Sequence, residues 1–468
     1  MSIKILSKAF TKVYAVLLVA GSLVFTSCEK LLEVDVPVNQ MVSESVYSDS
    51  LTALASLNGL YSYMYNGTGQ LAQSYFSFNA SLVPARSADE LTYRSANTDE
   101  FVTNSITVAN GTVSSAWANA YRAVNHANGI LEGVSASPLS PSLKQQISGE
   151  AKFLRAFCYF TLVNMFGDIP LVLTANVELV KDLPRENTAK VYAQIITDLT
   201  EARDQLPPDY SWSGNNRTRV NKWGASALLA RVYLYTQQWD MAEAEATKLI
   251  SQNTLFSLPT LSQAFLKASS EAIFQFYTNV NGYTFTGKEL LPGATDIVYI
   301  LTPQLVASFE RDPLRPEGED DRATEWVKTT TAGLPYAYKY RSNTAGQNTE
   351  YEMVLRLAEQ YLIRAESRAH QNKLTGAIED LNVIRTRAGL RGTEAVTKEQ
   401  ILLAIEHERQ VELFLEWGHR WFDLKRTGRA DAVLSPVKGT AWQSTDVLYP
   451  IPASARTINL NLGQNDGY

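Results

Sequence analysis

Apolar positions recur along most of this chain at the spacing of an amphipathic helix. Between Leu143 and Met165 they step by three or four residues and form one stripe, and Gly167 and Pro170 then end the predicted helix. The same spacing predicts further helices over 113–134, 189–206, 221–236, 241–251, 351–370, 374–387 and 398–417. The pattern therefore predicts a mainly α-helical protein.

Two long stretches lack this periodicity. Residues 66–114 are polar and rich in Ser, Thr and Asn, whereas residues 255–346 contain Gly, Pro and many aromatic residues. A short strand-like run, Ala272–Tyr277, lies in the second stretch. Irregular segments of this length in a compact protein are usually functional loops, so we interpret both stretches as functional loop insertions.

Two of the predicted helical pairs follow the tetratricopeptide pattern, in which small and aromatic residues recur at fixed positions. In residues 220–250, Ala230 takes the small position of the first helix, Trp239 the aromatic position of the turn, and Ala246 the second helix. A looser match covers residues 357–384. Stacked pairs of this kind form a solenoid with a concave face, which favours binding over catalysis.

The N-terminus has the layout of an export signal. Three lysines precede an apolar run over residues 13–25, which is shorter than the roughly 20 residues that span a bilayer. Cys28 follows two small residues, so we predict a lipoprotein signal over 1–27 and a lipidated Cys28; an ordinary secretory signal is the alternative. No Gly/Ser/Pro-rich linker divides residues 28–468, which we interpret as a single domain.

The charge of the chain argues against a nucleic-acid partner. Residues 1–27 contain three lysines and no acidic residue, so removing them changes the formal net charge from −6 to −9. Phosphate binding requires clustered Lys and Arg side chains instead. The other cysteine, Cys158, has no partner for an internal disulfide, and its apolar neighbours at helical spacing predict a buried, inert thiol.

Compact catalytic and metal-binding motifs are absent from the sequence. The four histidines are scattered, and the chain lacks the H-E-x-x-H, G-x-S-x-G, G-x-x-x-x-G-K-[ST] and G-x-G-x-x-G patterns. Glu408, Glu412 and Glu416 share one predicted helix face, which we interpret as an ion-paired face and not as the carboxylate pair of a glycosidase. We therefore expect no catalytic residue, cofactor or metal ion.

Several blocks of sequence resemble the SusD/RagB family. They are GEAKFLRAFCYFTLVNMFGDIPLV (149–172), LRLAEQYLIRAES (355–367), AIEDLNVIRTRAGL (377–390), IEHERQVELFLEWGHRWFDLKRTG (405–428) and LYPIPASARTINLNLGQNDGY (448–468), together with EKLLEVDVP after Cys28. The blocks occur in order over nearly the whole chain. In the fourth block, the alternation of charged and apolar residues predicts an ion-paired structural helix, with these charged residues: Glu408, Arg409, Glu412, Arg420 and Asp423.

The resemblance implies a fold, a location and two partners. The fold is a SusD-like solenoid scaffold of tetratricopeptide-like pairs, with long irregular loops that form the ligand face. The location is the outer membrane, where a lipid anchor displays the protein to the cell exterior. The partners are an oligosaccharide and a SusC-like TonB-dependent transporter, over which the protein sits as a hinged lid.

Glycan binding requires flat aromatic surfaces and converging polar groups, because sugars present apolar C–H faces as well as hydroxyls. Residues 75–97 and 277–340 supply both types, and the resemblance implies ligand contacts from these regions. We predict Tyr75, Tyr283, Trp326 and Tyr338 as stacking platforms, and Asp89 and Arg94 as hydroxyl partners. Three tryptophans within helical patterns are assigned to the core: Trp117, Trp223 and Trp239.

Three other functions are compatible with this sequence. The resemblance to RagB implies a variant that captures peptides or glycopeptides. A purely protein-binding helical scaffold predicts that the central aromatic residues are buried. A hydrolase that uses a carboxylate pair predicts product release from a polysaccharide.

Overall fold

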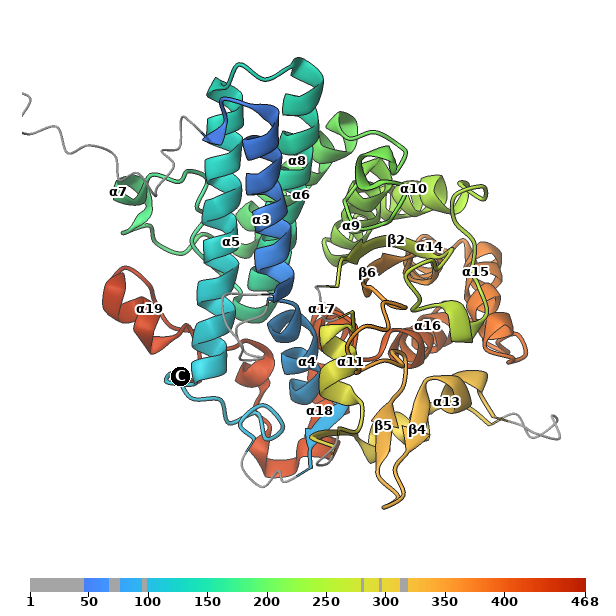
Figure 1. Cartoon of the computed structure of the whole chain (residues 1–468). Helices are drawn as coiled ribbons and strands as arrows, with labels where there is room; N and C mark the ends of the chain where they lie inside the picture. The colour runs from blue at the N-terminus through green and yellow to red at the C-terminus, as the bar shows by residue number, and fades with distance from the viewer. Residues whose placement is uncertain (1–45, 67–75, 95–98, 279–281, 294–296, 312–318) are drawn as a thin grey trace, which may run out of the picture. The chain divides into compact units, whose positions relative to one another are not determined.

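The computed structural model describes residues 46–66, 76–94, 99–278, 282–293, 297–311 and 319–468 (Figure 1). The predicted signal peptide over 1–27 and the predicted lipidation site Cys28 lie outside these residues. From Tyr47 onward the chain forms one compact unit. No helix among the described residues is both long and apolar enough to cross a bilayer.

Long helices make up the N-terminal half of this unit, as the apolar periodicity predicts. They pack side by side in Figure 1: α3 (Ser50–Asn66), α5 (Gly111–Ala136), α6 (Pro141–Phe166) and α8 (Thr188–Gln205). The last three each begin at a polar side chain that accepts hydrogen bonds from the first backbone N–H groups, namely Asn110, Ser140 and Asn187. The sequence therefore defines these helix starts locally.

Helix α6 is buried more fully than the single predicted stripe requires. Every residue from Glu150 to Phe166 except Lys152 is buried, because α5, α8 and α9 (Lys222–Tyr235) all pack against α6. Burial also raises the pKa of the Cys158 thiol, which confirms a buried, inert cysteine.

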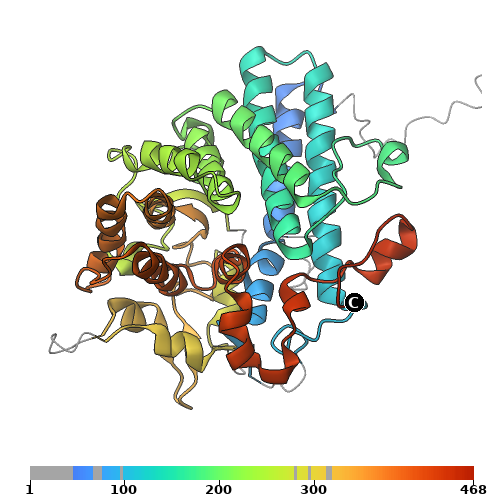
Figure 2. The ribbon, with the colours of Figure 1, turned by 180° about the vertical axis from the view of Figure 1, so that it is seen from behind.

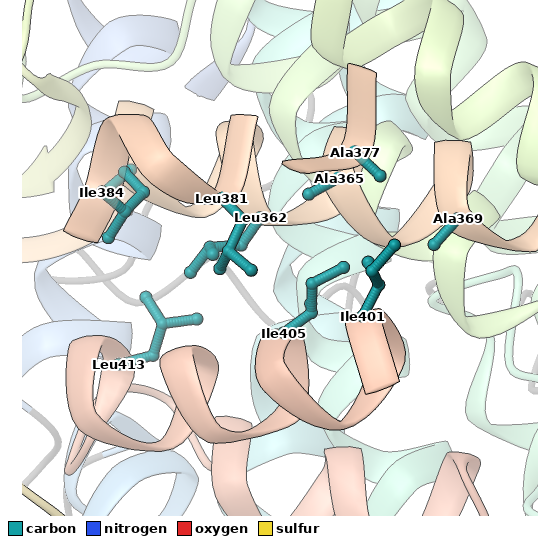
Figure 3. Packing of buried hydrophobic residues seen from close by; sticks show 10 residues of the cluster. Leu362, Ala365, Ala369, Ala377, Leu381, Ile384, Ile401, Ile405 and Leu413 are labelled. Atoms are coloured by element: carbon teal, nitrogen blue, oxygen red, sulfur yellow. The ribbon is translucent and has the colours of Figure 1, made fainter. Parts of the chain in front are cut away.

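The second half is built from consecutive helices that pack in pairs. They are α9 with α10 (Trp239–Ile250), and α14 (Leu357–His370) with α15 (Leu374–Arg387), followed by α16 (Lys398–Leu413). Figure 3 shows Leu362, Leu381 and Ile405 interlocking between α14, α15 and α16, with alanines at the close approaches. Figure 2 shows these helices from behind, beside the long N-terminal helices. The predicted pairs thus form, and their arrangement is compatible with tetratricopeptide-like packing.

The described residues contain three two-stranded antiparallel sheets, of which the first two connect distant parts of the chain and the third is a local hairpin. Their pairs are β1 (Leu91–Tyr93) with β3 (Tyr299–Leu301), β2 (Ala272–Phe276) with β6 (Glu352–Arg356), and β4 (Val327–Thr329) with β5 (Pro335–Ala337). The first sheet joins the two predicted insertions. The predicted strand over 272–277 is confirmed, but the helix predicted from residue 351 begins only at Leu357, because β6 occupies the intervening residues.

The first insertion is less irregular than predicted. Helix α4 (Phe76–Ser87) lies within it, and all of its residues are buried. The second insertion does consist mainly of loops with short elements, as predicted. The remaining short helices are α7 (Val177–Val180), α11 (Phe285–Leu290), α12 (Pro303–Ser308), α13 (Asp321–Glu325), α17 (His419–Arg426), α18 (Ala430–Lys438) and α19 (Ala453–Ile458).

Buried ion pairs join α16 to the second insertion. Glu412 accepts hydrogen bonds from Arg356 at 2.5 Å and Arg322 at 3.0 Å, and it also pairs with Arg387. These arginines outweigh the effect of burial and hold the pKa of Glu412 below its usual range. The predicted structural role of the charged block is confirmed, although the network lies in the interior and not on a solvated face.

Candidate functional site

An open cleft of about 390 Å³ lies where α3 meets the end of strand β2. This volume falls within the range of small-ligand sites, which is roughly 300–1,000 Å³. Aromatic, hydroxyl and amide side chains dominate its walls. The described lining residues are Asn58, Tyr61, Ser62, Tyr65, Trp212, Ser213, Thr218, Arg219, Phe276 and Tyr277.

Helix α3 forms one wall through residues three and four positions apart. Asn58, Tyr61, Ser62 and Tyr65 therefore lie on one side of the helix. The hydroxyl of Tyr61 donates to Glu150 at 2.6 Å, and the hydroxyl of Tyr65 accepts the Phe285 backbone N–H at 2.9 Å. Both phenol rings are thus fixed in position before any ligand arrives.

The floor of the cleft is a cluster of aromatic rings. Phe276 stacks on Tyr65 with a ring separation of 6.0 Å and meets Tyr61 edge-on at 6.4 Å. All three side chains are buried, so the floor is rigid and apolar.

Two exposed aromatic side chains stand at the rim. Trp212 is 41% exposed and Tyr277 is 61% exposed, although both side chains offer large apolar surfaces. Tyr277 follows directly after β2 and contacts Tyr351, with the ring centres 5.2 Å apart. Exposed, rigid aromatic rings beside a cleft are suited to stack on a flat ligand face.

The turn that carries Trp212 is held at both ends. Trp212 lies in a 3-10 turn, Ser211–Ser213, where the Asp209 carboxylate caps the Ser211 N–H at 2.9 Å. The Tyr210 hydroxyl donates to the Ile273 carbonyl of β2 at 2.9 Å. Beyond the turn, the Gln275 N–H donates to the Arg217 carbonyl at 2.8 Å. The platform is therefore fixed to the strand that forms the floor.

A buried ion pair underlies the polar side of the cleft. Glu150 is 0% exposed and accepts hydrogen bonds from two nitrogens of Arg219, at 2.8 and 3.0 Å, and from Gln146 at 2.5 Å. Burial lowers the pKa of Arg219, but Glu150 more than compensates, so the pKa ends above its usual value. Burial and the neighbouring Glu150 raise the pKa of the Tyr61 phenol well above its usual value, so the phenol remains protonated.

This arrangement can bind a ligand that has both apolar faces and hydroxyl groups. The rim aromatic residues offer stacking surfaces, while Asn58, Ser62 and Thr218 offer neutral donors and acceptors. Among the described residues that line the cleft, none is an Asp or Glu. The described lining thus lacks the two carboxylates that most glycosidases use.

The structure overturns two of the six predicted ligand contacts. Trp326 is 1% exposed, and its indole N–H donates to the Leu261 carbonyl at 3.0 Å, so it is a core residue. Asp89 is 4% exposed and forms a two-bond ion pair with Arg420, both bonds measuring 2.8 Å. Neither side chain is available to a ligand, because each lies in the interior.

The other four predicted contacts lie in different surroundings. Tyr283 and Tyr338 are half-buried, Arg94 is exposed after β1, and Tyr75 lies outside the described residues. Tyr338 packs beside Tyr336, with the ring centres 6.2 Å apart. Tyr283, Tyr338 and Arg94 are not among the described residues that line the cleft, and a ligand role for all four residues stays a prediction.

Sequence reasoning missed Trp212, although a signal was present. This tryptophan stands in the polar run SWSGNNRT, where no apolar stripe offers it a core position. The three tryptophans assigned to the core fare differently. Trp117 and Trp223 are buried as predicted, whereas Trp239 is only half-buried and stacks on His370 at 3.9 Å.

Family comparisons agree with the resemblance noted in the sequence. A SusD-like family model described as "starch-binding associating with outer membrane" matches residues 37–234. The model of the SusD family matches residues 314–468. Together the two matches cover most of the chain, including the helix that forms one wall of the cleft.

Relatives in other bacteria align along most of their length. A SusD-like protein of Formosa agariphila is 25% identical, over 94% of this chain and 95% of its own length. The starch-binding protein SusD of Bacteroides thetaiotaomicron is 26% identical, over 68% of this chain and 72% of its own length.

Solved structures share the fold. A SusD superfamily protein from Bacteroides vulgatus superposes with a TM-score of 0.78 at 22% identity, covering 90% of this chain and 100% of that one. A laminarin-binding SusD-like protein superposes with a TM-score of 0.74 at 23% identity, also covering 90% and 100%. At this level of identity the likeness shows the fold alone. The ligand of this chain has to be inferred from its own residues.

Proposed function

The chain belongs to the SusD family of outer-membrane-associated glycan-binding proteins, and we propose that it captures oligosaccharides or polysaccharide fragments in the cleft between α3 and β2. The observation that carries this proposal is the pair of exposed aromatic residues, Trp212 and Tyr277, on a rigid aromatic floor. A sugar ring that stacks there would also place its hydroxyls near the neutral polar side chains of α3.

The proposal includes a place on the cell surface and a partner. Lipidation at Cys28 would anchor the chain to the outer membrane, and the protein would face the cell exterior. The captured glycan would pass to a SusC-like TonB-dependent transporter, with this protein as a hinged lid. The family model's description as associating with the outer membrane supports the location. The anchor and the transporter rest on the signal-like N-terminus and on the family resemblance.

The protein acts in this proposal as a non-catalytic binder. Capture requires only that the protein bind the glycan. The aromatic rim and the neutral polar groups can provide this binding without a nucleophile or a general acid. The sites of glycosidases differ in kind, because they place two carboxyl groups on either side of the scissile bond.

A binding comparison between variants tests this assignment. Trp212→Ala removes the rim platform, and we expect it to weaken glycan binding about tenfold or more, since truncating a tryptophan anchor often costs ~2 kcal/mol. The control is Ile458→Ala, which removes an exposed apolar side chain from α19, outside the described lining of the cleft. Calorimetry against laminarin, soluble starch and a peptide digest provides the readout.

Three outcomes separate the candidate functions. Glycan binding that falls in Trp212→Ala and not in the control supports capture in this cleft. Saturable binding to the peptide digest and to no glycan would favour peptide capture as the function. Product release from any polysaccharide by the wild-type chain would contradict a purely binding role.

A further inference from the structure

Only one side chain of the cleft lining carries a charge at neutral pH. Among the described lining residues this is Arg219, because the tyrosines are neutral and the remaining residues cannot ionise. An isolated arginine in a half-buried site would attract carboxylates or sulfates, since its fork of N–H donors matches such groups.

The protein neutralises this arginine internally. Two of the three guanidinium nitrogens donate to the buried Glu150 carboxylate. Glu150 also accepts the Tyr61 hydroxyl and the Gln146 amide, so its charge is held by hydrogen bonds on several sides. The Arg219 side chain is 15% exposed against 0% for Glu150, so the cleft presents a pair whose formal charges cancel.

An anionic sugar that enters this cleft would lose hydrating water without gaining an ion pair, because Glu150 already compensates the charge of Arg219. Partly desolvating a carboxylate or sulfate is unfavourable unless an opposite charge is available, and here the guanidinium of Arg219 already pairs with Glu150. The formal net charge of −9 that the chain has without residues 1–27 adds a weaker repulsion, which salt screens beyond about 8–10 Å. A neutral sugar meets neither cost.

We propose that the cleft selects uncharged glycans and discriminates against uronate-containing or sulfated ones, because Glu150 neutralises Arg219, the one cation among the described lining residues. This inference rests on the proposed function and specifies its substrate class. Glu150 acts here as a positioning and charge-balancing residue beneath the ligand surface.

The first test is a binding panel with the wild-type chain starting after Cys28. The neutral probes are laminarin and soluble starch, and the anionic probes are alginate and polygalacturonate, each at 50 and 150 mM NaCl. We expect saturable binding of at least one neutral glycan and at least tenfold weaker binding of both anionic ones. If an anionic glycan binds as tightly as the neutral ones or more tightly, the charge inference is overturned and glycan capture stands. If no glycan binds, the charge inference and the proposed glycan capture are both overturned.

The second test changes the pair itself. Glu150→Gln keeps the size of the side chain and one acceptor oxygen, but replaces the second oxygen by an NH2 donor and leaves Arg219 uncompensated beside the cleft. We expect the affinity of this variant for the anionic glycans, measured relative to its affinity for the neutral ones, to rise about fivefold or more. The control is Glu178→Gln, which removes the same charge from the exposed helix α7.

Two results would contradict this mechanism. An equal gain in both variants would assign the effect to net charge and not to the cleft. No gain in a Glu150→Gln chain that melts cooperatively would show that the pair does not set selectivity. If Glu150→Gln fails to fold, the wild-type panel alone decides between neutral and anionic ligands.

Discussion

Trp326→Ala offers a direct test of the assignment of this side chain to the core. Phe265 meets the Trp326 ring edge-on at 5.5 Å, Phe414 lies at 6.4 Å, and the Lys339 ammonium lies 4.9 Å from the ring centre. The indole N–H also donates to the carbonyl of Leu261. Truncation would therefore leave a cavity, a Leu261 carbonyl that keeps only the long hydrogen bond from the Ala264 N–H, and a buried cation that has lost one of its three aromatic neighbours.

The magnitude follows from these losses. Large-to-small truncation of a buried Trp costs roughly 3–5 kcal/mol, and the lost hydrogen bond to the Leu261 carbonyl adds about 1 kcal/mol. We therefore expect a loss of about 5 kcal/mol in the free energy of unfolding, a large share of the typical 5–15 kcal/mol of a folded domain. Urea denaturation followed by far-UV circular dichroism measures this loss.

The matched variants separate stability from binding. Trp326→Phe retains most of the packing and should lose about 2 kcal/mol, while its glycan affinity stays close to that of the wild type. Trp212→Ala should lose less than about 1 kcal/mol, because the side chain is largely at the surface. A loss below about 1.5 kcal/mol in Trp326→Ala, together with weakened glycan binding, would refute the core assignment and restore Trp326 as a ligand platform.

Three further predictions concern buried charges and the N-terminus. Glu412→Gln removes a buried carboxylate that Arg322, Arg356 and Arg387 share, so urea denaturation should show a loss of roughly 3–5 kcal/mol, and a loss under about 1 kcal/mol would contradict the structural role. Burial raises the pKa of Glu352 from 4.5 to about 7, so the stability from this group is present below pH 4.5 and disappears as the pH rises through 7. Glu352→Gln should therefore gain stability relative to the wild type between pH 5 and 8, by at most about 3 kcal/mol, whereas a difference independent of pH would refute this. Cys28→Ala should abolish labelling by a fatty-acid probe in cells, and normal labelling would rule out lipidation at that residue.

The helices were predictable where one face of each meets solvent. The boundaries predicted for 374–387 coincide with α15, because its polar and apolar positions alternate clearly. Helix α4 was missed, since all of its residues are buried and its sequence carries no contrast between faces, and Pro84 lies inside it. The start of the helix predicted at residue 351 was wrong because a short apolar run is equally compatible with a buried strand.

The candidate site was less predictable than the fold. Asp89 and Trp326 stand in loop-like sequence, yet their partners lie far away in the chain, and only folding brings Arg420 to Asp89. The cleft likewise joins α3, a turn near residue 212 and the end of β2, three segments that share no local pattern. Composition could indicate a site of aromatic and polar residues, but not which of the aromatic residues would remain exposed.

The measurement that tests the central claim most directly is calorimetric titration of the wild-type chain and of Trp212→Ala with the same neutral glycan. We predict saturable binding by the wild type without product formation, and at least tenfold weaker binding by a variant whose melting temperature is unchanged. Equal affinity of the two proteins would contradict the assignment of glycan capture to the cleft between α3 and β2.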